Sequence, residues 1–225
     1  MMDDANIALS RGARGAGIGA VAFGVMTLAA TFLTDSPGGS YSASDVATYL
    51  SHGDRPTQLI SFFLAIFAIP GLVCMLAHLR DTLAATPERH RAASIVWGTG
   101  IAAAACFAIG WGVDGGQIFA HWEGGSAIIV PAPITYLISE IGVVFVFGCG
   151  AMLLGFALIT LTLNSRELLP GWLRGLVLVF GLCGVAGLAW ATFFVMLFGT
   201  GVLGVWLVAR GRGAAARDLA LHPST

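Results

Sequence analysis

The sequence predicts an all-α protein, a polytopic transmembrane bundle of six helices with both termini cytoplasmic. Composition, the length of the apolar runs and the distribution of arginines lead to this prediction. Of the 225 residues, 57% are hydrophobic and 10% are charged, with a mean hydropathy of +0.86. Soluble domains carry about 25% charged residues, so this chain lacks the polar surface of a water-soluble globule. Several apolar runs reach ~18 residues, enough to cross a bilayer as a helix.

The apolar runs set the number of spans. The chain from Trp172 to Ala209 runs for 38 residues with one charge, Arg174. One helix of that length would measure about 57 Å, nearly twice the ~30 Å hydrocarbon core. We therefore expect two short spans there, joined by a tight turn near Trp190. The six predicted spans are residues 15–34, 57–79, 92–113, 134–163, 172–189 and 193–209.

The arginines set the orientation. All 11 basic residues are arginine, which is typical of a GC-rich bacterial genome. With six spans and a cytoplasmic N-terminus, only Arg55 falls outside, as the positive-inside rule requires. The ten arginines then on the cytoplasmic side are Arg11, Arg14, Arg80, Arg89, Arg91, Arg166, Arg174, Arg210, Arg212 and Arg217. We predict a multi-pass protein of the bacterial plasma membrane, with segments 1–14 and 211–225 in the cytoplasm.

The longest connections fall on the outer side. Between the first two spans, "SASDVATYLSHG" (residues 42–53) predicts a short helix capped by Ser42 or Ser44 and stopped by Gly53. Val46 and Tyr49 share a face of this helix, so we expect it to lie on the membrane surface or over the mouth of the bundle.

The outer ends of the predicted spans hold the candidate ligand or ion-pair residues: Arg55, Asp114, His121, Glu123 and Glu140. The 21 residues after Glu140 make about 31 Å of helix, enough to span the core alone, which places this carboxylate at the outer rim. One interpretation is a vestibule that binds a cation, a proton or a polar ligand. The interpretation we favour is a structural ion pair between Arg55 and Glu140 or Asp114, because pairing reduces the desolvation cost of both partners.

Metal, cofactor and nucleotide sites are not predicted. Cys74 and His78 share a helix face, but a metal needs three or four ligands and no third is evident. Gly199, Gly201 and Gly204 match G-x-G-x-x-G without the strand and soluble βαβ unit of a nucleotide site, so we assign them to helix packing. The net charge of −1 disfavours nucleic acid.

A resemblance covers most of the chain, from about Asp45 to Arg210. The stretches "VATYLSHGDRPTQLISFFLAIFAIPGLVCMLAHLRDTL", "ERHRAASIVWGTGIAAAA" and "SRELLPGWLRGLVLVFGLCGVAG" resemble small six-helix actinobacterial integral-membrane proteins that share a domain of unknown function. The resemblance implies a six-helix membrane bundle without a known activity, and it assigns no residue a functional role.

Three functions remain open at this point. The sequence favours a non-catalytic bundle that acts as an accessory subunit or binds a lipid or other ligand. A small proton- or cation-linked transporter or channel is the first alternative, and a membrane-embedded enzyme that uses the outer acidic residues is the second. The expected partners are the lipid bilayer and either another membrane protein or a second copy of the chain.

Overall fold

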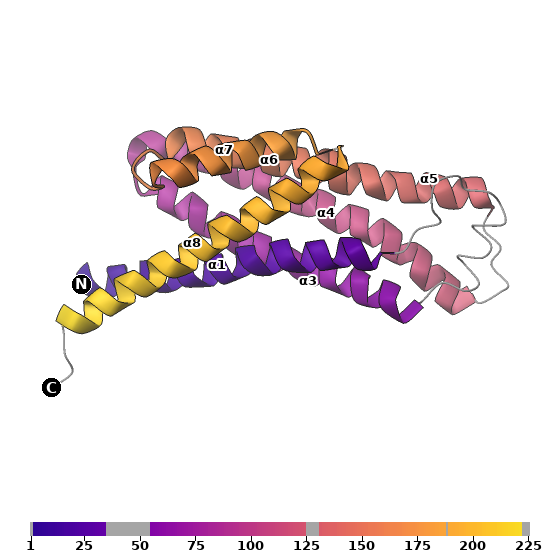
Figure 1. The fold of residues 1–225 in the computed structure, drawn as a ribbon, viewed down its shortest axis with the longest axis horizontal. Coiled ribbons are helices and arrows are strands. Elements are labelled where there is room, and N and C mark those ends of the chain that lie inside the picture. The colour runs from indigo at the N-terminus through magenta and orange to yellow at the C-terminus, as the bar shows by residue number, and fades with distance from the viewer. Residues whose placement is uncertain (1, 35–54, 125–130, 188, 222–225) are drawn as a thin grey trace.

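The computed structural model of the protein describes residues 2–34, 55–124, 131–187 and 189–221. These residues form six helical rods and no strand, which confirms the predicted all-α fold. Figure 1 shows the start of the first rod and the end of the last at the same end of the bundle, here called the terminal end. The opposite end is called the far end. The short helix predicted at residues 42–53 lies outside the described residues.

The rods follow the chain in order. The first three are α1 (Met2–Leu33), α3 (Arg55–Ala84) and α4 (His90–Gly124), with a 3₁₀ turn at Pro87–Arg89 between α3 and α4. The fourth rod joins α5 (Ala132–Val143), a π-helical turn (Val144–Gly150) and α6 (Ala151–Asn164). The last two are α7 (Gly171–Val185) and α8 (Trp190–Leu221). Within the described residues, five helices are long and apolar enough to cross a membrane, and α7 is a shorter apolar helix.

The six rods form a closed ring. Each packs against the next along the chain, and α8 returns to pack along α1, so α1 lies between α3 and α8. Aromatic rings from four rods fill the middle of this ring. Phe23, Phe107 and Phe193 are each at most 1% exposed. The Phe193 ring centroid lies 4.4 Å from that of Phe147, whose ring also stacks on Trp190 at 4.5 Å.

Glycines let neighbouring helices approach at backbone distance, as small residues do in membrane proteins. A Cβ on Gly17 of α1 would lie 2.5 Å from the Gly204 carbonyl oxygen of α8. Similarly, a Cβ on Gly19 would lie 2.7 Å from the Gly71 oxygen of α3. In α6 and α7, a Cβ on Gly155 would lie 2.5 Å from the Gly181 oxygen.

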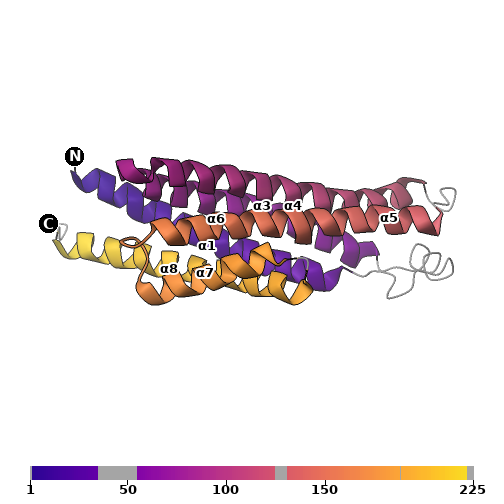
Figure 2. The ribbon, with the colours of Figure 1, turned by 90° about the horizontal axis from the view of Figure 1, so that it is seen from above.

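The six rods do not all reach the far end of the bundle. The 15 residues of α7 make about 22 Å of helix, less than the ~30 Å core. The turn between α7 and α8 therefore lies well short of the far ends of α4 and α5, which project beyond it in both Figure 1 and Figure 2. This turn directly precedes Trp190, where the sequence predicts it.

Several helices run past their predicted spans: α1 begins at Met2, within the predicted cytoplasmic segment 1–14, α3 ends at Ala84, and α4 and α8 run furthest beyond their predicted ends. α4 continues 11 residues beyond Val113, because the Phe62 ring of α3 packs onto Gly115 and meets the Phe119 ring at a centroid distance of 5.6 Å. α8 continues past Arg210 to Leu221, through a stretch rich in alanine, arginine and leucine, which are strong helix formers. The segment predicted as a polar tail thus begins as helix.

Candidate functional site

The predicted outer residues lie at the far end, on the projecting parts of the bundle. Asp114 belongs to the interior of α4, and Glu140 lies on α5, the antiparallel neighbour of α4. The Asp114 Oδ1 atom is 2.7 Å from the position of a Cβ on Gly142, so the carboxylate packs against the α5 backbone two residues from Glu140. Among the described residues, neither carboxylate has an ion-pair or hydrogen-bond partner.

For the remaining three outer residues, the structure describes only the backbone. Arg55 is the first residue of α3, and His121 and Glu123 lie in the last turn of α4. Their side chains lie outside the described part of the structure. The predicted ion pair of Arg55 therefore stays a prediction. The fold brings Asp114 and the Glu140 segment onto adjacent helices but does not join them in one described site.

The weak metal candidates lie on α3 near the terminal end. Cys74 is exposed, whereas His78 is half-buried, with its Nδ1 atom 3.5 Å from the position of a Cβ on Gly12 of α1. Within the described ranges, no group of three or more His, Cys, Asp or Glu side chains gathers as a metal site would require.

The glycine motif of α8 serves helix packing at two of its three positions. A Cβ on Gly204 would collide with α1, and one on Gly199 would collide with the Phe180 ring of α7. Gly201 differs, because a Cβ there would meet no atom within 4 Å. Gly201 therefore leaves open space on the outer surface of the bundle.

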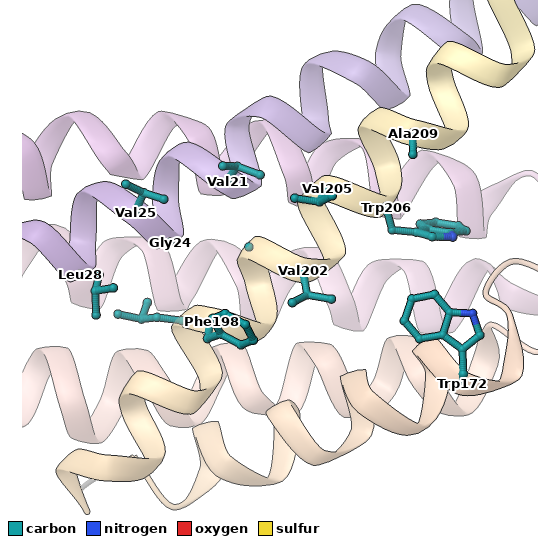
Figure 3. Close-up of a pocket in the computed structure, with 12 residues that line it drawn as sticks. Val21, Gly24, Val25, Leu28, Trp172, Phe198, Val202, Val205, Trp206 and Ala209 are labelled. Atoms are coloured by element: carbon teal, nitrogen blue, oxygen red, sulfur yellow. The ribbon is translucent and has the colours of Figure 1, made fainter.

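That space belongs to a groove of about 570 Å³, a volume in the range of ~300–1,000 Å³ found for small-molecule sites. Figure 3 shows α1 and α8 along its length and Trp172 at one end. It is lined by Val21, Gly24, Val25 and Leu28 of α1, by Trp172 of α7, and by residues between Leu197 and Ala209 of α8. All the lining residues are apolar, and several, such as Phe198 at 71% and Val205 at 61%, are exposed on the outside of the bundle.

The groove has the dimensions of one bilayer leaflet. From Leu197 to Ala209 the α8 axis rises about 18 Å, close to half of the ~30 Å hydrocarbon core. The indole rings of Trp172 and Trp206 lie together at the end nearer the termini, as Figure 3 shows. Tryptophan is enriched at the level of the lipid headgroups, so this end of the groove matches a membrane interface.

A guanidinium group is fixed beside this end. The Arg210 Cζ atom lies 5.3 Å from the centroid of the Trp206 ring, a cation–π arrangement. The Arg210 Nη1 atom donates a hydrogen bond of 2.9 Å to the Leu168 carbonyl oxygen in the α6–α7 connection. The apolar groove therefore has a positioned positive charge beside its tryptophan end.

Sequence reasoning missed this groove. It read Gly201 as a packing residue and assigned Trp172 and Trp206 to no site. The groove depends on how α1 packs beside α7 and α8, which lie at the other end of the chain. The one available signal was the position of both tryptophans beside arginines at the same predicted membrane face.

In comparisons with known proteins, no family model, no curated protein and no solved structure matches this chain. The resemblance drawn from the sequence therefore stays a prediction, and the function has to be argued from the site itself.

Proposed function

We propose that this protein is a non-catalytic membrane bundle that binds a phospholipid, with one acyl chain seated in the groove between α1, α7 and α8. The observation that carries the proposal is the groove itself, which is apolar throughout and one leaflet deep. An acyl chain suits it because its walls are almost wholly apolar and offer little to orient a polar solute. The exposed apolar side chains around it belong to a surface that faces hydrocarbon.

The filled interior of the ring supports a binding role over a conducting one. Phe23, Phe107 and Phe193 occupy the centre of the bundle and are almost completely buried. A channel would need a polar path through this region. The transporter and enzyme alternatives would rely on Asp114 and Glu140, which do not form a described site with a third polar group.

The orientation belongs to the same proposal. We place the terminal end in the cytoplasm of a bacterial cell, because the positive-inside rule puts arginine-rich ends there. The groove then opens to the inner leaflet of the plasma membrane, and the tryptophan pair lies at the cytoplasmic interface. The membership of the six-helix family suggested by the sequence is compatible with this role.

Native mass spectrometry tests the proposal directly. The protein is reconstituted in vesicles that contain both phosphatidylglycerol and phosphatidylcholine, extracted in mild detergent and examined for retained lipid of either kind. We expect one phospholipid adduct on the wild type. Gly201→Leu should lose most of the adduct, because the new side chain enters the groove without meeting another atom at its Cβ.

The matched control is Gly112→Leu, at an exposed α4 glycine where a Cβ also meets nothing within 4 Å. This variant should retain lipid as the wild type does. A wild type without an adduct, or equal retention by Gly201→Leu and the wild type, would contradict the proposed function.

A further inference from the structure

We infer that the lipid held in this groove is an anionic phospholipid, with its phosphate bound between Arg210 of α8 and Arg14 of α1. The inference rests on the proposed function and names the class of headgroup. It begins from the charge at the tryptophan end of the groove, where the guanidinium of Arg210 is fixed next to Trp206.

Arg210 keeps hydrogen-bonding capacity for a ligand. A guanidinium has five N–H donors in a rigid fork, and Nη1 of Arg210 donates one bond to Leu168. The side chain is exposed, so the other donors face the surface of the protein. A fork of this kind matches the oxygens of a phosphate, which arginine binds in a bidentate manner.

Arg14 lies at the same level on the other wall of the groove. Gly17 packs on Gly204 and Val208, and Arg14 precedes Gly17 by one turn while Arg210 follows Val208 by two residues. Because α1 and α8 are antiparallel, both arginines lie toward the terminal end from this contact. Arg14 is also two turns from Val21, which places it on the stripe of α1 that lines the groove.

The charges of these two arginines are not neutralised within the described protein. No described carboxylate lies within ion-pair distance of either guanidinium, although Arg89 and Glu167 do form such a pair at 2.9 Å on the same end of the bundle. Two free positive charges at the headgroup level therefore complement an anionic lipid. A zwitterionic lipid would bring its own cation into the same positive field.

The experiment uses the same adduct measurement as a competition. The full-length protein is reconstituted in vesicles with equal amounts of phosphatidylglycerol and phosphatidylcholine that carry identical acyl chains. We expect the retained lipid to be mainly phosphatidylglycerol. The preference should fall about fivefold for each arginine replaced in Arg14→Gln, Arg210→Gln and the double variant.

One control variant and one of the test variants separate charge recognition from folding. Arg91→Gln removes an exposed arginine from the start of α4, away from the groove, and should keep the preference. Arg14→Gln loses a charge that makes no described hydrogen bond, so its effect on the lipid ratio does not depend on the Arg210 contact with Leu168.

The outcomes are distinct for the two proposals. Retention of one lipid with no preference in the wild type would overturn this inference and leave the proposed function standing. Equal loss of preference in Arg91→Gln would also overturn it, because any basic residue near the membrane would then suffice. A wild type that retains neither lipid would overturn the proposed function, and this inference with it.

Discussion

Two neighbouring glycines of α8 show how one helix can both hold a membrane fold and leave a binding surface. Gly204 meets the backbone of α1 so closely that a Cβ would lie 2.7 Å from the Gly17 oxygen. Gly201, three residues earlier, faces open space in the groove. Glycine thus allows close helix contact at position 204 and leaves space for a ligand at position 201. The distinction depends on the neighbouring helix, since the local sequence is glycine-rich at both.

Gly204→Leu should have the largest effect on stability. The new side chain would meet the Gly17 oxygen, the Ala20 Cβ and the Val21 side chain, so α1 and α8 have to separate. We expect a loss of at least about 3 kcal/mol in the free energy of unfolding, the upper part of the range for overpacking, because backbone cannot yield as a side chain can. Thermal unfolding in detergent, followed by circular dichroism, measures the change.

Gly201→Leu provides the comparison in the same assay. It should leave the unfolding temperature near that of the wild type, while it lowers lipid retention. Equal destabilisation by the two substitutions would show that the two glycine positions do not differ in the way their contacts indicate.

Two phenylalanines on α8 extend the comparison to side-chain packing. Phe193 is 0% exposed in the aromatic centre, and Phe198 is 71% exposed on the groove. Phe193→Ala should cost about 3 kcal/mol, because it leaves a cavity among Phe23, Phe107 and Phe147. Phe198→Ala should cost under about 1 kcal/mol, since lipid can replace the lost contacts of an exposed side chain. Reversible unfolding in mixed micelles would measure both, and similar costs would contradict the assignment of the two faces.

The sequence predicted the architecture better than the site for a physical reason. The bilayer fixes the length of apolar runs, and arginine distribution fixes their alternation, so six helices and the turn before Trp190 follow from the chain alone. Helix ends outside the core lack this constraint. Continuation of α4 to Gly124 depends on packing by Phe62, which no local pattern reveals.

The groove and the π-helical turn show the same limit. The turn at Val144–Gly150 places Phe147 against Trp190 and Phe193, yet its sequence reads as an ordinary apolar helix. Glycine motifs correctly indicated close packing at Gly204 but could not show that Gly201 is open. The outer acidic residues stand out in the sequence because charge is rare in this chain. A site built from apolar side chains has the same composition as the rest of the spans, so the sequence does not distinguish it.

The smallest expected effect concerns the other flank of α1, where α3 adds a hydrogen bond to the glycine contact. The Ser61 hydroxyl donates to the Ala30 carbonyl oxygen at 2.8 Å and lies 2.7 Å from the Thr34 hydroxyl oxygen. Ser61→Ala should cost about 0.6 kcal/mol, the average for such bonds in membranes, because the Ala30 oxygen keeps its helical partner, the Thr34 amide. Chemical unfolding in micelles can resolve this difference when Ser94→Ala, which removes an exposed bond within α4, serves as the control. A cost near that of Gly204→Leu would mean that hydrogen bonding holds α1 to α3 as strongly as backbone contact holds α1 to α8. The two flanks of α1 would then be held by different kinds of interaction.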